Sequence, residues 1–325
     1  MRLATILPEN SNLPLAAVSV DAQNWVGLHT FLSFFGVKDI PQNPSALLAD
    51  FLPMLMPRFS ELTRKVSDWP EHGRVFQGRG GKTIRAKRFL SPILRPPSFR
   101  DFYAFEQHAR TARSRHGLDM IPAWYEIPVF YFSNPNSLVG NDESIVGPAG
   151  SNELDYELEL GVVIGNRVRN VPPTQAWQCV AGFTVINDFS ARDLQRGEMA
   201  VGLGPGKGKD FATAVGPILV TRDEFADKMN SDAISLEMRA MVNGRELSRG
   251  NSNSLFHTFP KMIAHASRDA DLFPGDLIGS GTVGTGCILE LSPEHTGGWL
   301  KPGDTVELEI ERIGILRTKI AQRQV

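Results

Sequence analysis

The stretch that most constrains the fold is Leu154–Ile164, which reads LDYELELGVVI. Apolar and acidic residues alternate strictly over its first seven positions, and this period of two is typical of a β-strand with one apolar and one polar face. Glu157 and Glu159 are therefore predicted to point to the same side, roughly 7 Å apart along the strand. Two carboxylates this close repel each other unless water, a shared proton or a cation intervenes. The residues alone leave two interpretations open, a solvated acidic face and a divalent-cation site.

Length and composition are those of a globular protein. At 325 residues the chain exceeds most single-core domains, so two domains are expected, and 42% hydrophobic with 22% charged residues is ordinary. The net charge of −2 gives no general attraction to nucleic acid or to an anionic membrane, and no apolar run is long enough to cross a bilayer. Cys179 and Cys287 lack the spacing of a zinc site or a disulfide framework, and nothing near Cys287 would activate it as a nucleophile. We therefore expect a reduced, cytoplasmic protein.

The first 95 residues are predicted to form a small domain. Segments 3–7, 15–20 and 25–30 are typical of strands, and a helix is expected at 45–66, interrupted by two prolines. Residues 74–95 contain basic side chains and no acidic one, but the glycine that a phosphate-binding loop needs would fall at Phe76. An ordinary strand at 83–89 with a charged outer face is favoured. Prolines at 92, 96 and 97 indicate a boundary between domains 1–95 and 96–325.

A helix is predicted to begin at Ser98, because Ser98-Phe99-Arg100-Asp101 resembles a capping box. Asp101 and His108 would then lie two turns apart on one helix face. By themselves they fit a helix cap and an ordinary histidine. If that face met the acidic strand, Asp101 would add an oxygen ligand and His108 a base that titrates near neutrality. A strand is predicted at 124–131, with Tyr131 at its end either binding substrate or capping the core.

A second group of polar residues follows the apolar strand Ala181–Ile186. Asp188 comes just before a helix that a capping-box-like sequence at Ser190 would start, and Arg192 and Gln195 project from one side of that helix. A carboxylate, a guanidinium and an amide at the end of a buried strand suit oxygen ligation and anion binding. A solvated helix start fits these residues equally well.

Two glycine-rich loops lie further along the chain. Gly202–Asp210 follows a helix rather than opening one, which argues against a Rossmann nucleotide site and suits a loop that brings Lys209 close to a substrate anion. Gly279–Gly286 permits tight turns, and the local pattern assigns no function to Thr282 or to Glu290 beyond it.

Four segments, taken together and in this order, resemble the fumarylacetoacetate hydrolase family. They are Arg95–Tyr103 (RPPSFRDFY), Leu154–Glu159 (LDYELE), Asn187–Gln195 (NDFSARDLQ) and Gly279–Thr282 (GSGT). The resemblance covers essentially all of residues 95–320, and the first 95 residues look like the variable N-terminal region of longer members. It implies an α+β, β-rich fold, a mixed β-sandwich roll of the fumarylacetoacetase C-terminal type with a smaller N-terminal domain.

The resemblance also implies a metal site and a base. The implied ligands of Mg²⁺ or Ca²⁺, with Mn²⁺ as a possible substitute, are Asp101, Glu157, Glu159 and Asp188. Such an all-oxygen site suits these hard cations. His108 matches the family's base, and Glu290 matches the acid that orients it.

Further positions match groups that act on the substrate. Those that would stabilise developing negative charge are Arg192, Gln195 and Lys209, with Lys207 as an alternative to Lys209. Those that would contact substrate are Tyr103, Tyr131 and Thr282. Two positions depart from the family pattern: Met199 replaces a substrate-binding tyrosine, and the arginine that follows the histidine has no clear counterpart in Arg113–Gly117.

The implied activity is metal-dependent hydrolysis of a C–C bond in a β-diketo acid of the fumarylacetoacetate or acylpyruvate type, in aromatic or sugar-acid catabolism. His108, held by Glu290, would activate water, and the metal and Lys209 would stabilise the resulting enolate. Hydration, decarboxylation and isomerisation of 2-keto acids stay open, because an enolate beside a metal serves all three. A non-catalytic keto-acid-binding protein is a further alternative. A small keto acid is the expected ligand and a homodimer the expected assembly, with neither nucleic acid nor membrane as partner.

Overall fold

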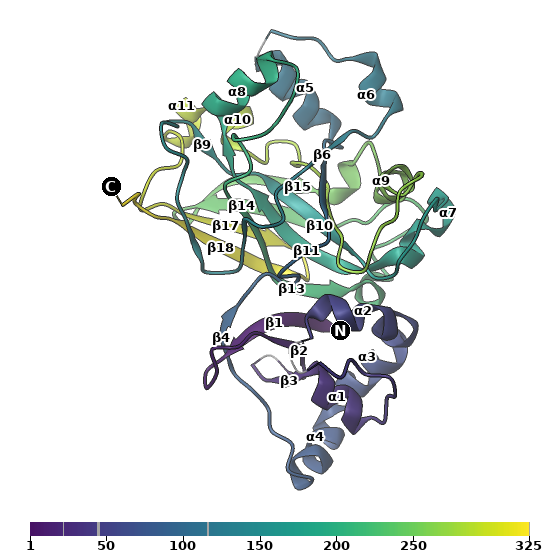
Figure 1. Ribbon diagram of the computed structural model, residues 1–325. Helices are drawn as coiled ribbons and strands as arrows, with labels where there is room; N and C mark the ends of the chain where they lie inside the picture. Colours follow the sequence, from purple (N-terminus) through teal and green to yellow (C-terminus); the bar gives the residue numbers. More distant parts are fainter. Residues whose placement is uncertain (22, 44–45, 116, 325) are drawn as a thin grey trace.

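The structure is a computed structural model that describes residues 1–21, 23–43, 46–115 and 117–324. In Figure 1 the purple and blue N-terminal segment, with most of its helices, forms one end of the molecule, and the teal to yellow strands form the larger part. Among the described residues, none of the helices has both the length and the apolar character that a bilayer-spanning helix requires.

The largest sheet of the described chain is mixed and includes strands from the N-terminal segment. Its main path is β3 (Trp25–Gly27), β2 (Leu15–Ser19), β1 (Arg2–Pro8), β13 (Thr213–Thr221), β11 (Val180–Asp188), β10 (Leu158–Ile164), β16 (Leu277–Gly279), β5 (Phe99–Phe102) and β6 (Phe130–Phe132). Off this path, β4 (Ala86–Phe89) pairs with β1, and β7 (Leu138–Val139) pairs with β13.

A second sheet faces the first. Its order is β15 (Arg245–Asn251), β14 (Glu237–Val242), β17 (Thr305–Ile310), β18 (Gly314–Ile320) and β8 (Ser144–Ile145). A short ladder joins β9 (Leu154–Asp155) to β12 (Ser190–Ala191).

The α-helices fall into two groups along the chain. The N-terminal group is α1 (Leu28–Phe34), α2 (Leu48–Leu55), α3 (Phe59–Ser67) and α4 (Trp69–Gly78). The later ones are α5 (Glu106–Arg115), α6 (Pro122–Glu126), α7 (Pro173–Ala176), α8 (Arg192–Ala200), α9 (Phe259–Ala266), α10 (Ile288–Leu291) and α11 (Pro293–Thr296). Short 3₁₀ turns are η1 (Met56–Arg58), η2 (Trp177–Cys179), η3 (Arg222–Phe225) and η4 (Ser252–Ser254).

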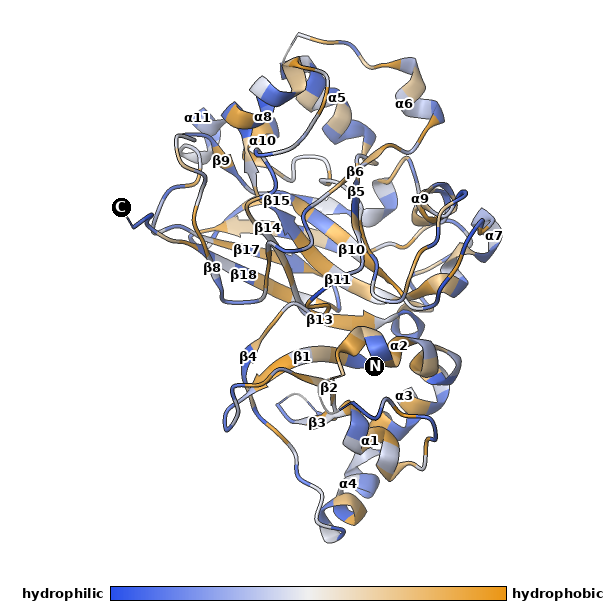
Figure 2. Cartoon of the chain, viewed as in Figure 1, coloured by the Kyte–Doolittle hydropathy of each residue, from blue (hydrophilic) through white to orange (hydrophobic). Residues whose placement is uncertain are grey.

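Two apolar cores cover opposite faces of the large sheet. On one face, alternate residues of β10, such as Leu160 and Val162, pack with residues of β14 and β17 from the second sheet. On the other face, Val163 of β10 and Leu219 of β13 pack with residues of α1 and α2, such as Phe31. Figure 2 shows apolar residues along much of β1 and β13, where these layers meet. Because the central strands are buried on both faces, they contain nearly continuous apolar runs. The predicted β-rich, α+β sandwich is confirmed.

The N-terminal strands continue the same sheet. Leu3 of β1 lies opposite Leu219 of β13, while β2 pairs with β1 over Leu3–Ile6 and β4 pairs with it over Ile6–Pro8. The predicted helix at 45–66 is confirmed as α2 and α3, with η1 between them, although its first residue, Ser45, lies outside the described residues. The predicted strand at 25–30 ends early, at Gly27, because α1 begins at Leu28. The division at residue 95 stays a prediction.

Two predictions between residues 98 and 131 were wrong. No helix begins at Ser98; residues Phe99–Phe102 form β5, which pairs with β16 on one side and β6 on the other. Two strand partners from distant parts of the chain outweigh the weak local capping pattern. The segment predicted as a strand at 124–131 is mostly helix α6, which Pro122 starts at its first position, and β6 begins only at Phe130.

The stretch at 154–164 forms two strands rather than one. β9 ends at Asp155, β10 begins at Leu158, and the backbone N–H of Glu157 between them donates to the side chain of Asn187 at 3.0 Å. The predicted cap at Ser190 is also wrong, because α8 starts at Arg192 without a side-chain cap and the Ser190 hydroxyl donates to the carbonyl of Asp188.

Candidate functional site

The acidic stretch does not face solvent. Glu157 is 4% exposed and Glu159 is fully buried, so the interpretation as a solvated acidic face is wrong. Asp101 on β5 and Asp188 at the end of β11 are also buried. β10, β16 and β5 are adjacent strands, and Gly279 of β16 pairs with Asp101. The sheet therefore gathers the four predicted ligands from three strands and a strand break.

Three carboxylate oxygens in this region lack a hydrogen-bond partner. They are Oδ1 of Asp101 and both Oε atoms of Glu159. A Cβ at Gly279 would lie 2.2 Å from Asp101 Oδ1 and 2.9 Å from Glu159 Oε2, so only a glycine leaves this space free. Buried polar atoms without partners are rare, and a bound ion or water is one explanation for them. The donor set, the free oxygens and the space beside Gly279 all fit a hard divalent cation.

The charges of these acids are incompletely balanced. Burial, followed by the neighbouring charge of Asp188, raises the pKa of Asp101 to about 7. Burial, followed by the charge of Asp101, raises the pKa of Glu159 well above its ordinary value. A cation near both oxygens would reverse these shifts, because an opposite charge favours the ionised form.

Lys209 and Tyr131 bridge the other two predicted ligands. The Lys209 ammonium donates to Glu157 and, at 2.6 Å, to Oδ2 of Asp188, and the Tyr131 hydroxyl donates to Asp188 and, at 3.0 Å, to Asp101. Although burial opposes ionisation, Lys209 and Arg192 lower the pKa of Glu157 to about 2. Lys209 thus lies among the predicted ligands.

The glycine loop that carries Lys209 is tied to α8. Glu198 of α8 accepts backbone N–H bonds from Gly206 at 2.9 Å, from Lys207 at 2.5 Å and from Gly208 at 3.1 Å. The side chain of Lys207 is exposed and pairs with Asp210 at 2.8 Å. Lys209, and not Lys207, therefore points into the cluster.

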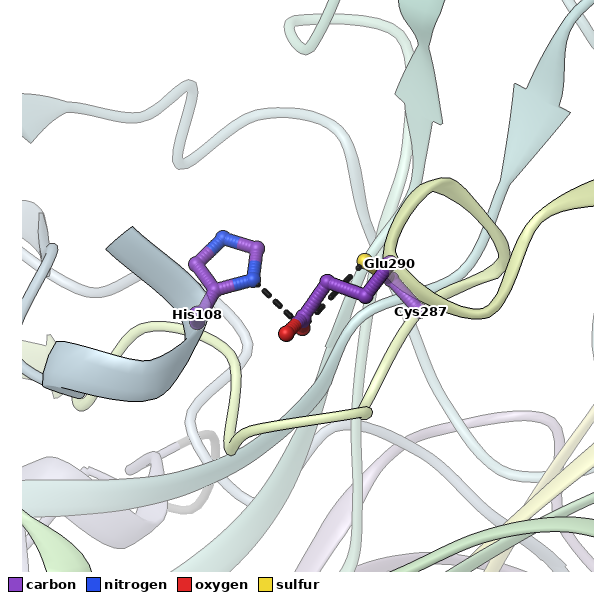
Figure 3. Close-up of side chains that lie close together, drawn as sticks. All are labelled: His108, Cys287 and Glu290. Atoms are coloured by element: carbon purple, nitrogen blue, oxygen red, sulfur yellow. Dashed lines mark hydrogen bonds and ion pairs between the residues drawn. The ribbon is translucent and has the colours of Figure 1, made fainter. Parts of the chain in front are cut away.

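His108 and Glu290 form a close buried pair (Figure 3). Nδ1–H of His108 on α5 donates to Oε1 of Glu290 on α10 at 2.6 Å, which leaves Nε2 free to accept a proton. The backbone N–H of Thr285 donates to Oε2 of Glu290 at 3.1 Å, and the Cys287 thiol contacts Oε1 at 3.6 Å. A carboxylate held at Nδ1 is the arrangement that orients a histidine base.

Arg192 joins Asp155 of β9 to Glu157, which lies between β9 and β10. Its guanidinium donates to Asp155 and Glu157 at 2.8 Å each and to the side chain of Gln195 at 3.0 Å. Asp155 also accepts the backbone N–H of Ile288 at 2.7 Å, at the start of α10. Asp155 therefore has a structural role and holds Arg192 and α10 together.

The residues predicted to contact substrate differ in their burial and in their neighbours. The ring of Tyr103 lies edge-on to His108 with 5.3 Å between centroids, and its hydroxyl donates to the carbonyl of Ala109. Thr282 is buried, and its hydroxyl lacks a partner. Met199, by contrast, is 60% exposed on α8. Within 113–117, Arg115 donates to the backbone carbonyl of Glu290 at 3.0 Å, while residue 116 lies outside the described residues.

Sequence reasoning missed several supporting residues. Thr213 donates to Oδ1 of Asp188 at 2.8 Å, Asn187 fixes the backbone of Glu157, and Glu198 holds the lysine loop. Asn187 stood in the matched motif, which was a usable signal. Thr213 and Glu198 lie in no recognisable motif, so their contacts follow only from the fold.

The chain is similar to known enzymes and to one protein family. The family described as fumarylacetoacetate (FAA) hydrolase C-terminal matches residues 98–321. The mitochondrial oxaloacetate tautomerase FAHD2A of Bos taurus is 36% identical over 232 residues, which cover 71% of this chain and 69% of that protein. The 2,4-didehydro-3-deoxy-L-rhamnonate hydrolase of Sphingomonas sp. (strain SKA58) is 35% identical over 198 residues, 60% of this chain and 65% of that protein.

A solved structure extends the likeness to the whole chain. The maleylpyruvate hydrolase of Sphingobium sp. SYK-6, crystallised with manganese(II) and pyruvate, superposes with a TM-score of 0.68 at 22% identity and covers 100% of both chains. This likeness shows a shared fold. The family match spans most of the chain, and the named relatives are enzymes of the hydrolase and tautomerase types. The chain belongs to the fumarylacetoacetate hydrolase family.

Proposed function

We propose that this protein is a metal-dependent enzyme that hydrolyses a C–C bond in a β-diketo acid of the fumarylacetoacetate or acylpyruvate type. The observation that carries the proposal is the buried His108–Glu290 pair, together with a set of buried carboxylates that have partnerless oxygens. A base held by an acid favours activation of water, which hydrolysis and hydration both need.

We propose Asp101, Glu157, Glu159 and Asp188 as the metal ligands. Mg²⁺ or Ca²⁺ is the expected cation because every donor is oxygen, and Mn²⁺ is a possible substitute. The maleylpyruvate hydrolase described above contains manganese(II) with pyruvate, which supports a divalent cation and a keto acid as ligands. A bound cation would polarise the substrate carbonyl and lower the energy of the developing negative charge.

The chain's own residues supply the remaining chemistry. Nε2 of His108 takes a proton from water while the water oxygen bonds to the substrate carbonyl carbon, and Glu290 stabilises the imidazolium through Nδ1–H. After the C–C bond breaks, the imidazolium returns this proton to the enolate carbon. Lys209, a buried cation, favours the negative charge of the enolate that leaves when the C–C bond breaks. Arg192 and Gln195 take part in stabilising that charge, and Tyr103, Tyr131 and Thr282 contact the substrate.

A second candidate activity is keto–enol tautomerisation or another isomerisation of an oxaloacetate-like acid. The bovine relative named oxaloacetate tautomerase favours it, at 36% identity. Such a reaction uses the same base and the same enolate but leaves every C–C bond intact. Hydration and decarboxylation of 2-keto acids stay further alternatives, as does non-catalytic keto-acid binding.

The experiment is a substrate screen. Purified protein is incubated with Mg²⁺ or with EDTA and with β-diketo acids, enol-keto acids and oxaloacetate, and enol absorbance and products are followed. Cation-dependent appearance of two cleavage products supports hydrolysis, and interconversion without cleavage supports the tautomerase. The variant Glu290→Gln should lose most of the activity, and Glu9→Gln, at an exposed turn, should match the wild type. Keto-acid binding without turnover under any condition would contradict an enzymatic function.

We also propose a cytoplasmic homodimer. The proposal follows from family resemblance and from the cysteine content, and a mitochondrial relative makes the location a point to test. Light scattering should give a mass twice that of the 35.8 kDa chain, and cell fractionation should place the protein in the soluble fraction. A monomeric mass, or co-fractionation with an organelle, would contradict the respective part.

A further inference from the structure

A second group of ligand-type atoms lies in the His108–Glu290 pair itself (Figure 3). One ligand atom from each of His108, Cys287 and Glu290 lies within 4.8 Å of the other two, and all three side chains are buried. Oε1 of Glu290 lies 2.6 Å from Nδ1 of His108 and 3.6 Å from Sγ of Cys287. They come from α5, from the residue before α10 and from α10. Within the described chain, this is the one group of three histidine, cysteine or acidic ligand atoms that lie so close together.

The donors of this cluster differ in kind from those of the carboxylate site. One nitrogen, one sulfur and one oxygen are the ligands of zinc, whereas Mg²⁺ and Ca²⁺ prefer oxygen alone. Zinc binds nitrogen and oxygen at about 2.0–2.2 Å and sulfur at about 2.3 Å, so tetrahedral ligands lie roughly 3.3–3.6 Å apart. The sulfur and oxygen are already 3.6 Å apart. The nitrogen and oxygen, now 2.6 Å apart, need to separate by less than about 1 Å.

The surroundings support one more cation here. Backbone N–H of Thr285 holds Oε2 of Glu290, which leaves Oε1 to bind a metal through a single oxygen. The nearby guanidinium of Arg192 is neutralised by its ion pairs with Asp155 and Glu157 at 2.8 Å. A thiolate, a carboxylate and a neutral imidazole balance the charge of Zn²⁺.

We propose that His108, Cys287 and Glu290 form an inhibitory binding site for Zn²⁺, distinct from the four-carboxylate site, with water as the fourth ligand. On binding, the S–H bond of Cys287 breaks, a Zn–S bond forms and the proton passes to solvent, without any change of oxidation state. Zinc takes Nδ1 of His108 away from Glu290: the N–H bond at Nδ1 breaks with loss of its proton to solvent, a Zn–N bond forms, and Nε2 takes up a proton from solvent, so the imidazole stays neutral. The base of the proposed reaction is thereby removed.

Binding is tested without any activity measurement. The variant Glu159→Gln disables the carboxylate site and leaves this cluster unchanged, and Co²⁺ serves as the spectroscopic probe. We expect one cobalt ion per chain with a near-ultraviolet thiolate-to-cobalt charge-transfer band. Adding Cys287→Ser should remove the band, whereas adding Cys179→Ser, at the other buried cysteine, should preserve it. A missing band in Glu159→Gln, or its persistence after Cys287→Ser, would overturn the proposal.

Inhibition is tested separately and rests on the proposed activity. With Mg²⁺ in excess, Zn²⁺ should inhibit the wild type, and Cys287→Ala should raise the zinc concentration for half-inhibition at least about tenfold, relative to its own zinc-free rate. Circular dichroism confirms that the variant is folded. Equal zinc sensitivity of wild type and Cys287→Ala would place the inhibition at the carboxylates and overturn the inhibitory role. A protein without any turnover would still give the cobalt result, so the two failures are distinguishable.

Discussion

Glu159→Gln should have opposite effects on stability in the absence and in the presence of a divalent cation. Without a cation, the buried Glu159 carboxylate lacks any hydrogen-bond donor, and Oδ1 of Asp101 beside it lacks one as well. Glutamine keeps the shape of the side chain, cannot ionise and offers N–H donors to Asp101. The substitution therefore relieves an unfavourable arrangement in the metal-free protein.

The size of both effects can be worked from these contacts. A buried polar group without a partner costs about 1–3 kcal/mol, and more when it is charged, so the metal-free variant should gain about 1–3 kcal/mol in free energy of unfolding. A cation at a hundred times its dissociation constant stabilises the wild type by about 2.7 kcal/mol. The variant should lose this stabilisation because one ligand no longer carries charge. Stability should thus rank the variant above the wild type in EDTA and at or below it in Mg²⁺.

The assay is chemical denaturation followed by tryptophan fluorescence, in EDTA and in saturating Mg²⁺. Glu9→Gln is the matched control, because Glu9 is exposed and the same substitution there should change neither curve. If Glu159→Gln destabilised the metal-free protein, the partnerless oxygens would not lower the free energy of unfolding of the metal-free wild type. If it kept the full response to Mg²⁺, Glu159 would not be a metal ligand.

Three further outcomes are expected. Glu290→Gln should lower kcat by about 10²–10⁴-fold, because His108 loses the charge that orients it, while calorimetric titration should find Mg²⁺ affinity unchanged; weaker binding would refute separate roles. The raised pKa of Asp101, about 7 through burial and then Asp188, lies above its unfolded value of about 4. The metal-free protein is therefore most stable below about pH 4, and its free energy of unfolding falls as the pH rises from about 4 to about 7. Melting temperatures in EDTA that increase between these two pH values would contradict the shift. Glu198→Ala should release three backbone N–H groups and speed proteolysis within 202–208, with lower activity; an unchanged cleavage rate would exclude a role in holding the loop.

Local patterns predicted the strands better than the connections between them. Ala181–Ile186 is apolar except for Thr184 because β11 is buried on both faces, and such runs are recognisable without a structure. The capping-box pattern at Ser98 was misleading, because the pairing of β5 with β16 and β6 depends on residues far away in the chain. The four residues of the capping-box pattern contain no information about that pairing.

The residues of the candidate site also differ in how well the sequence predicts them. Motif resemblance proposed Asp101 and Glu290 as site residues, although the helix predicted for Asp101 was wrong and Glu290 had no local signal. The Thr213–Asp188 bond joins residues 25 positions apart, and only the fold brings them together. Residues in motifs were therefore identifiable, whereas residues that support them through long-range contacts were not.

The pairing of β1 with β13 has a consequence for the evolution and engineering of this chain. Residue 95 is a convenient place to cut the sequence, but hydrogen bonds cross from β1 to the strand beside β11, whose last residue is Asp188. A fragment that began after residue 95 would expose the backbone edge of β13 together with the apolar face under α1 and α2. Open sheet edges pair readily with other chains. In the intact chain β1 therefore covers this edge of β13. Exchanging the N-terminal segment between relatives would require the edge of β13 and the apolar face under α1 and α2 to be exchanged together with it.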